Sequence, residues 1–349
     1  MNLRILQSQL QDHLFRHGRS ETLHLLAHGE ANLIFRLGED RLVRVAMGTP
    51  NRRFQSDPVR VSAFEARILK YLAGTDISHH LYYSHLLPSP DFLYTYLITS
   101  YLEGRHLDYS RVQLQACAQT LAQLHRLPLQ GHTLNQLTPP LVRVQEPLSL
   151  FYQEAQSYAQ SYLDFAEGDA EVKALLCAVL AMAESFLPKE PLLHHYPYLC
   201  LVHSDHTYDN WIINRHHAHL IDWEWAEVGT PAGDLGHFLS PVTLTRWHNY
   251  TMPTEDRDYF LNSYFTALED PQLAEIIHLH MGVFGFFPAL RSLCWTPAQW
   301  IREDHWYEQS QDQHASTQLR QQRREEGKRR FGELGIATLQ LAAALREAL

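Results

Sequence analysis

The stretch that decides the fold is H-S-D-H-T-Y-D-N, from His203 to Asn210, followed by I-D-W-E from Ile221. Asp205 follows a short apolar run that predicts a buried strand, and the amide of Asn210 comes shortly after it. A second carboxylate, Asp222, ends a predicted hairpin in which W-I-I-N and H-L-I-D-W flank the turn R-H-H-A. A tight loop and a hairpin can bring these three oxygen-bearing side chains together. Metal-assisted phosphoryl transfer needs such a set, with one carboxylate for the acceptor hydroxyl and two oxygen ligands for Mg²⁺.

These motifs resemble the kinase-like phosphotransferases of the aminoglycoside phosphotransferase and choline kinase superfamily. In that family the catalytic loop has the pattern H-G-D-x-x-x-x-N, and a later I-D-[WF]-[ED] supplies a metal-binding aspartate. The resemblance extends to A-E-V-G-T-P-A-G-D-L-G, residues 226–236. It implies Asp205 as catalytic base, Asn210 and Asp222 as Mg²⁺ ligands, and His203 and Asp234 as supports of the catalytic loop.

The departures from the family pattern are few. Ser204 stands where glycine is common, and Tyr208 with Asp209 replaces the common Pro-Gly. None of these changes removes an essential oxygen, so we expect an active enzyme rather than a degraded one. Asp209 either reaches the metal or the acceptor, or it stabilises the loop.

The segment 23–46 contains three short apolar runs separated by H-G-E-A-N and G-E-D-R, which predicts an antiparallel meander. Residues 50–60 are expected to form a loop. A helix is predicted from Ser62, with Ser62 as N-cap, Glu65 in a capping box and Gly74 as C-cap. Residues 92–101, rich in aromatic and β-branched side chains, predict another strand.

The resemblance assigns nucleotide-binding roles to this N-terminal part. Gly29 would lie in the nucleotide loop, although a plain hairpin turn explains it equally well. Arg44 stands where the family has a phosphate-contacting Lys or Arg, and Glu65 matches the helix glutamate that pairs with that cation, as an alternative to its capping role. The backbone of Ser100 and Leu102 would form the hinge that binds adenine, with GTP as an alternative nucleotide.

The expected fold is α+β: a two-lobed protein-kinase-like fold with a small N-lobe, residues 1–102, and a mostly helical C-lobe, residues 103–349. The N-lobe would carry the antiparallel sheet with a helix, and the C-lobe would carry the catalytic-loop hairpin. Helical periodicity supports this division, and it recurs in 2–16, in 114–127, in two segments of 147–187 broken near Gly168, and beyond Asp234.

The composition suits a soluble globular protein. The chain has 349 residues, 45% of them hydrophobic and 19% charged, and a formal net charge of −10. An acidic balance argues against a general nucleic-acid binder, because phosphate backbones require a basic surface. The four cysteines have no metal-ligand spacing, and no apolar run reaches the ~20 residues of a membrane span. We therefore expect a cytoplasmic protein with no nucleic-acid or membrane partner; its oligomeric state is not predicted.

Two other features have plainer explanations. His216, His217 and His219 are expected on the hairpin turn, where a metal site would lack a partnering acidic or thiol ligand. The mixed charges of residues 320–333, at helical spacing, predict a solvated helix face.

The acceptor site is expected in the C-lobe. The stretch from Cys294 combines aromatic rings with carboxylates, and the candidates are Trp300, Asp304 and Trp306. Such a set can hold a cationic amine through cation–π and charge pairing. The alternative is ordinary core aromatics beside a solvated acidic face, and related enzymes also phosphorylate uncharged alcohols.

The predicted activity is transfer of the γ-phosphoryl of ATP to a hydroxyl of a small molecule, such as an aminoglycoside-, choline- or sugar-like alcohol. One alternative is a nucleotide-binding regulatory module without turnover. Another is protein phosphorylation, although the chain lacks a recognisable H-R-D, D-F-G and A-P-E set.

Overall fold

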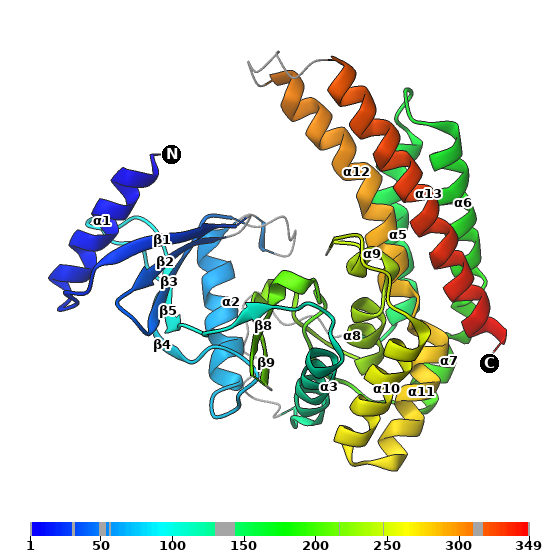
Figure 1. The fold of residues 1–349 in the computed structure, drawn as a ribbon, viewed down its shortest axis with the longest axis horizontal. Coiled ribbons are helices and arrows are strands. Elements are labelled where there is room, and N and C mark those ends of the chain that lie inside the picture. The colour runs from blue at the N-terminus through cyan, green and yellow to red at the C-terminus, as the bar shows by residue number, and fades with distance from the viewer. Residues whose placement is uncertain are drawn as a thin grey trace. The chain divides into compact units, whose positions relative to one another are not determined.

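The structure, a computed structural model, describes residues 2–29, 32–48, 54–55, 57–129, 144–215, 217–246, 248–309 and 317–347 (Figure 1). Side chains are described for these residues except 302–309, 317–324 and 346–347. The chain divides into two compact units. The sheet unit comprises Met1–Val142 and Asp209–Glu227, and the helical unit comprises Arg143–Tyr208 and Val228–Leu349. The expected lobe boundary at residue 102 stays a prediction.

The sheet unit is built on a five-stranded antiparallel sheet with the strand order β1-β2-β3-β5-β4. Its strands are β1 Leu23–His28, β2 Asn32–Leu37, β3 Arg41–Ala46, β4 Leu81–His85 and β5 Tyr96–Ser100. The predicted meander is confirmed, since β1 pairs with β2 and β2 with β3 in antiparallel register. The strand expected over 92–101 is shorter than predicted, and β4 was not predicted at all.

One face of this sheet carries a hydrophobic core together with α1, Leu3–Arg16. Asn2 caps the helix by accepting from the backbone N–H groups of Arg4 and Ile5. The buried leucines of α1 fall on one helical face, as the sequence predicted, and they pack with alternate residues of β2, β3 and β5. The core residues of α1 and of the strands are Leu6, Leu10, Leu14, Leu33, Phe35, Leu37, Val43, Val45, Tyr96 and Ile98.

The second helix, α2, runs over Pro58–Tyr71 and corrects the prediction at its start. Asp57 is the N-cap, accepting from Val59 N–H, and Pro58 occupies the first turn, where its missing N–H costs nothing. Ser62 is therefore inside the helix, and its buried hydroxyl hydrogen-bonds Thr95 at 2.9 Å. The helix ends before Gly74, which has a φ of +86° that suits glycine.

The rest of the sheet unit contains the expected helix and hairpin. The elements are β6 Arg105–His106, α3 Arg111–Arg126, the 3₁₀ turn η3 Tyr208–Asn210, β8 Trp211–Asn214, β9 His217–Leu220 and the 3₁₀ turn η4 Trp223–Trp225. The hairpin turn is tighter than predicted, because His217 and His219 lie on β9 rather than in the turn. Nδ1–H of His219 donates to the Asp76 carbonyl at 2.6 Å. His216 lies outside the described residues.

The helical unit confirms the helical character expected for the C-terminal part. Its helices are α5 Pro147–Leu163, α6 Ala170–Glu184, η2 Leu187–Lys189, α7 Glu190–His195, α8 Pro231–Phe238, α9 Pro241–Leu244, α10 Thr254–Leu268, α11 Pro271–Phe284, α12 Phe287–Gln309 and α13 Thr317–Glu347. A two-stranded sheet pairs β7, Cys200–Val202, with β10, Glu227–Gly229. The long helices α5, α6, α12 and α13 lie side by side (Figure 1).

One segment, Pro271–Ile301, is long and apolar enough by composition to cross a membrane. Its most apolar window has a mean hydropathy of 1.5, and 61% of that window is buried inside the protein. The segment contains α11 and the first part of α12, whose apolar residues pack within the helical unit. Burial of this kind is what the core helices of a folded unit require. The four cysteines are free thiols.

Candidate active site

The candidate residues fall into two sets, one in each unit, and each set is described by itself. In the sheet unit the central residue is Arg44, on β3. Its side chain is only 5% exposed and makes an ion pair with Glu65 of α2, with Nη1 2.8 Å from Oε1. Its Nη2 lies 3.5 Å from Oδ1 of Asp222. The structure thus brings together three residues that the sequence had singled out, and Glu65 pairs with Arg44 rather than capping a helix.

The Arg44 guanidinium stands between two carboxylates whose affinities for protons are both raised. Burial raises the pKa of Glu65 to about 7, while Arg44 opposes that rise and Asp222 adds to it. Burial and the neighbouring Asp209 also raise the pKa of Asp222, again against the effect of Arg44. The Nε of Arg44 is buried and has no hydrogen-bond partner within the described part of the chain. This donor is the kind of group that a phosphate oxygen satisfies.

Asn210 and Asp222 are held beside each other by the hairpin. The backbone N–H of Ile221 donates to the Asn210 carbonyl at 3.0 Å, at the open end of the hairpin where β8 begins and β9 ends. Trp223 fixes the next turn by donating its indole N–H to Ser78 Oγ at 2.9 Å. Asp222 adopts a left-handed conformation with a φ of +66°, which aspartate tolerates better than most residues, and its side chain is 37% exposed. An amide oxygen and a carboxylate in this setting suit Mg²⁺.

Some backbone groups that the sequence assigned to nucleotide binding already make hydrogen bonds within the protein. The N–H of Ser100 donates to the His80 carbonyl at 2.8 Å, and its carbonyl lies 3.0 Å from Nδ1 of His79. Leu102, half-buried in the connection between β5 and β6, fits the predicted hinge position better than Ser100 does. The N–H of Gly29 donates to the Asn32 carbonyl at 2.9 Å, which is the plain hairpin contact that the sequence allowed.

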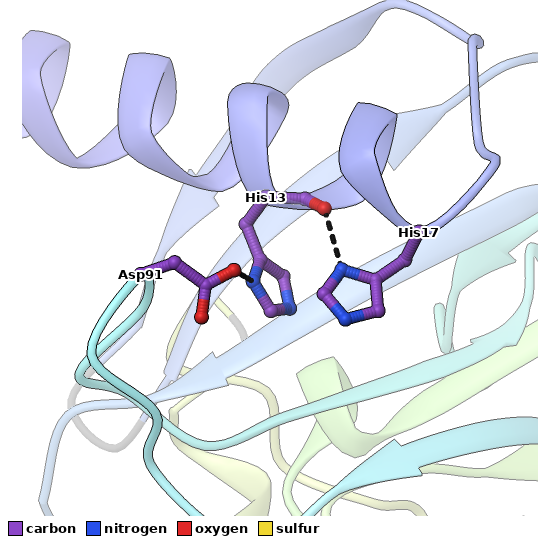
Figure 2. A group of neighbouring side chains, drawn as sticks. All are labelled: His13, His17 and Asp91. Carbon is purple, nitrogen blue, oxygen red and sulfur yellow. Dashed lines mark hydrogen bonds and ion pairs between the residues drawn. The ribbon is translucent and has the colours of Figure 1, made fainter.

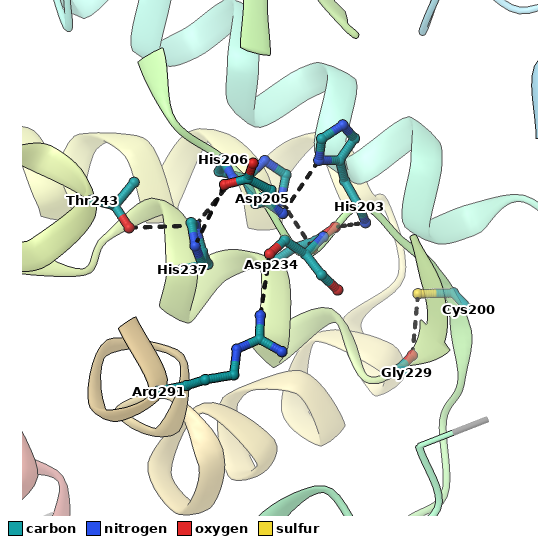
Figure 3. Close-up of polar contacts among 10 residues, drawn as sticks. Cys200, His203, Asp205, His206, Gly229, Asp234, His237, Thr243 and Arg291 are labelled. Carbon is teal, nitrogen blue, oxygen red and sulfur yellow. Dashed lines mark hydrogen bonds and ion pairs between the residues drawn. The ribbon is translucent and has the colours of Figure 1, made fainter. Parts of the chain in front are cut away.

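In the helical unit, Asp234 of α8 supports the loop that follows β7 (Figure 3). Its side chain is 0% exposed, and its two oxygens accept from the backbone N–H groups of His203, at 2.9 Å, and Ser204, at 2.8 Å. Ser204 has a φ of +66°, a left-handed conformation that explains why glycine suits this position. The backbone N–H of Asp205 in turn donates to Nδ1 of His203 at 3.3 Å. Two residues expected to support the loop thus contact it directly.

The side chain of Asp205 is 28% exposed and lies beside a histidine that the sequence reasoning missed. Nε2 of His237 is 3.9 Å from Oδ1 of Asp205 (Figure 3). Nδ1 of His237 accepts from the His206 backbone N–H at 3.0 Å, so its ring proton is on Nε2, facing Asp205. Burial, the neighbouring His206 and the Arg291 guanidinium hold the pKa of His237 well below its usual value.

A second missed group is the ion pair of Arg291 and Glu154, from α12 and α5. Arg291 Nη1 lies 3.3 Å from Glu154, and Nη2 donates to the Ser204 carbonyl at 3.4 Å. The guanidinium also lies over the Phe151 ring, 4.3 Å from its centroid. The spacing of Asp234 and His237, three positions apart on one helix face, was a usable signal for His237. Nothing local in the sequence links Arg291 to the loop.

The structure describes one of the three acceptor candidates. Trp300 packs edge-on against Tyr162, with ring centroids 6.2 Å apart, and against Phe331 at 5.7 Å. These are the contacts of a tryptophan that joins α12 to α5 and α13, the alternative that the sequence had left open. Asp304 and Trp306 belong to α12, and their side chains lie outside the described set.

Comparison with known proteins identifies the class. The chain matches the model of the phosphotransferase enzyme family (APH) over residues 22–277, and it belongs to that family. This assignment makes the chain a phosphotransferase and confirms the resemblance found in the sequence. No curated protein matched the chain.

Solved structures show the same kinase-like α+β fold. An ethanolamine kinase from Plasmodium vivax has a TM-score of 0.62 at 14% identity, with 99% of this chain and 88% of that one covered. A choline/ethanolamine kinase family protein from Mesorhizobium loti has a TM-score of 0.57 at 16% identity, covering 98% of each chain. A spectinomycin phosphotransferase in complex with ADP and spectinomycin has a TM-score of 0.57 at 14% identity, covering 97% and 98%. The predicted fold class is confirmed.

Proposed function

We propose that the chain transfers the γ-phosphoryl group of ATP to a hydroxyl of a small molecule. The observation that carries the proposal is the carboxylate Asp234, which holds two consecutive backbone N–H groups and so fixes the loop that presents Asp205. The family assignment supports phosphoryl transfer, and the solved relative with bound ADP supports a nucleotide as donor.

Arg44 is proposed to bind the phosphates of the nucleotide. The guanidinium is permanently charged, is aligned by Glu65, and retains a buried Nε donor that has no partner among the described residues. Leu102 would offer its backbone to the adenine, and the chain's hinge residues do not distinguish ATP from GTP.

Asn210 and Asp222 are proposed to hold Mg²⁺. The fit rests on their oxygen chemistry and on the raised pKa of Asp222, which reflects burial and the nearby Asp209 carboxylate and which a divalent cation would reverse. When bound, Mg²⁺ would neutralise negative charge on the phosphates.

Asp205 is proposed to orient the acceptor hydroxyl and to take its proton. The acceptor oxygen then forms a bond to the γ-phosphorus while the bond from phosphorus to the bridging oxygen breaks, and ADP leaves with the bonding electron pair. His203 and Asp234 hold the loop backbone, and the Nε2–H of His237 faces the Asp205 carboxylate. Positioning and electrostatics supply most of the rate enhancement in reactions of this class.

The acceptor is proposed to be an amino alcohol or a similar cationic alcohol. The printed names of the compared proteins concern ethanolamine, choline and spectinomycin. The net charge of −10 agrees with a cationic acceptor but does not select one.

The test is a screen of purified protein with Mg²⁺ and ATP or GTP for ADP or GDP release. The acceptor panel contains amino alcohols, aminoglycosides, sugars, hydroxy amino acids and a protein substrate. One small-molecule acceptor should stimulate release, and phosphorylated product should form in equal amount. Nucleotide binding with no stimulation by any acceptor would favour a regulatory binding module, and stimulation by the protein alone would favour protein phosphorylation.

A further inference from the structure

A cluster of imidazoles and a carboxylate lies at the end of α1, apart from the candidate active site residues of the sheet unit (Figure 2). His13 lies in the last turn of α1, His17 is the C-cap residue of that helix, and Asp91 comes from the connection between β4 and β5. One ligand atom from each of the three residues lies within 4.8 Å of the others. Among the described residues this is the group with the spacing of a metal site.

The closest pair in the cluster is His13 and Asp91, which are joined by a hydrogen bond. Nδ1 of His13 is 2.8 Å from Oδ2 of Asp91, and a proton shared between them forms a hydrogen bond. Zinc binds nitrogen and oxygen ligands at about 2.0–2.2 Å, so neighbouring ligand atoms of a tetrahedral site lie about 3.3–3.6 Å apart. A divalent ion would therefore replace that proton once the two side chains separate by roughly half an ångström. His17 is exposed, and its Nδ1 donates to the His13 carbonyl at 2.8 Å, so Nε2 is the nitrogen left for a metal ion (Figure 2).

We propose that His13, His17 and Asp91 form a binding site for a divalent transition metal ion with the ligand preference of Zn²⁺. The site is structural: it fastens the C-terminal turn of α1 to the connection before β5. Imidazole and carboxylate ligands suit zinc, and water would complete the coordination on the exposed side. Neither the phosphotransferase assignment nor the proposed Mg²⁺ ligands account for these three residues.

Side chains next to His13 would help to hold a cation at this cluster. The ring of His85, on β4, lies 4.9 Å from that of His13, and its buried Nε2 has no hydrogen-bond partner within the described residues. The Tyr96 hydroxyl lies 3.1 Å from Nε2 of His13 and would orient the ring once Nδ1 binds metal. Arg16 is a nearby cation, with Nη1 4.0 Å from Oδ2 of Asp91 on an exposed side chain that can swing away.

The test uses the tag-free, full-length protein stripped of metal with EDTA. Titration with Co²⁺, followed by the visible absorption of tetrahedral cobalt, and competition with Zn²⁺ should show one tight site per chain. Zn²⁺ should also raise the Tm of the metal-free protein. In His17→Ala the affinity should fall by about tenfold or more, and the rise in Tm should disappear. His24→Ala, which removes an exposed histidine of β1, is the matched control and should behave like the wild type.

The alternative is a closed hydrogen-bond network with no metal. In that case the wild type, His17→Ala and His24→Ala bind Co²⁺ equally weakly, and the proposal is wrong. Asp91→Asn gives a second test that does not depend on His17. Zn²⁺ should no longer raise the Tm of this variant. The substitution should therefore lower the Tm measured with Zn²⁺ by more than the Tm of the metal-free protein. If Asp91→Asn retains tight Zn²⁺ binding, the site does not use this carboxylate and the proposal fails. Acceptor-stimulated ADP release is measured separately, so failure of either proposal is recognised independently.

Discussion

At the scale of single residues, one buried carboxylate does the most to shape the catalytic loop. Asp234 accepts from two consecutive backbone N–H groups and also lies 2.9 Å from Nε2 of His206. A carboxylate offers only acceptors, so it satisfies both N–H groups at once, whereas an amide in the same place would present a donor to one of them. The loop conformation, including the left-handed Ser204, therefore depends on the charge at this position.

Replacement of Asp234 by asparagine should lower both activity and stability. We expect a loss of about 2–4 kcal/mol in the free energy of unfolding, because buried N–H groups lose an acceptor and a buried charge network is broken. The turnover number should fall while the KM for nucleotide stays near the wild-type value. Urea unfolding and steady-state kinetics measure these effects.

Asp270→Asn is the matched control, because Asp270 also accepts a backbone N–H, at the start of α11, but on the surface. Asp270→Asn should lower the free energy of unfolding by about a few tenths of a kcal/mol, since asparagine caps helices well. Equal losses in the two variants would contradict the special role of Asp234.

Glu65 predicts a pH effect on stability. Its pKa in the folded protein, about 7, lies above its ordinary value of 4.5, so the folded state holds the proton more tightly. The resulting contribution is fully present below pH 4.5 and is lost as the pH rises through 7. Relative to Glu65→Gln, the wild type should therefore lose stability between pH 4.5 and 7, as measured by urea unfolding. A constant difference between the wild type and Glu65→Gln over this pH range would mean that Arg44 keeps Glu65 ionised throughout.

At the scale of elements, α2 shows how a sequence pattern can be misinterpreted. Ser62 and Glu65 have the spacing of a capping box, yet the N-cap lies five residues earlier, at the stronger signal of Asp57 followed by Pro58. The two residues serve tertiary contacts instead, with Thr95 and with Arg44. A local pattern could not distinguish these uses, because both partners come from distant parts of the chain.

Removal of the true cap tests where this helix begins. Asp57→Ala should cost about 1 kcal/mol of unfolding free energy, since Val59 N–H loses its acceptor. Asp40→Ala, in an exposed turn, is the control and should be nearly neutral. If Asp57→Ala leaves the free energy of unfolding unchanged, Asp57 does not cap α2.

Strands with a local signal were predicted, and β4, which lacks one, was missed together with the short strands β6 and β10. The meander over 23–46 follows from apolar runs separated by short polar turns, and the 211–220 hairpin from two runs around a polar turn. β4, with the sequence L-Y-Y-S-H, is largely solvent-facing and lacks that alternation; its pairing with β5 forms the strand. Arg291 was missed for the same reason, because its partners Glu154 and Ser204 lie far away in sequence. His237 was missed although its spacing from Asp234 was a usable signal.

At the scale of the whole molecule, the candidate site residues separate into two sets. Arg44, Glu65, Asn210 and Asp222 belong to the sheet unit, and Asp205 with Asp234 belongs to the helical unit. The sequence order hides this division, because residues 203–222 contribute to both. The net charge of −10 likewise says little about the site, whose sheet-unit set is centred on a buried arginine.

This division predicts separable kinetic effects. Arg44→Lys keeps the charge but loses the forked geometry, so the KM for ATP should rise by about tenfold with a smaller change in turnover number. Arg41→Lys, on the same strand but paired with Glu21, is the control and should leave both constants unchanged. An unchanged KM for ATP in Arg44→Lys would show that Arg44 does not bind the nucleotide.

The most direct test of the central claim is acceptor-stimulated ADP release by wild type, Asp205→Asn and Asp164→Asn, an exposed control in the helical unit. With the best acceptor, Asp205→Asn should lose at least about 10²-fold in turnover number, because the base is gone, while its affinity for ATP stays unchanged. Asp164→Asn should match the wild type. Full acceptor-stimulated turnover in Asp205→Asn would contradict the account.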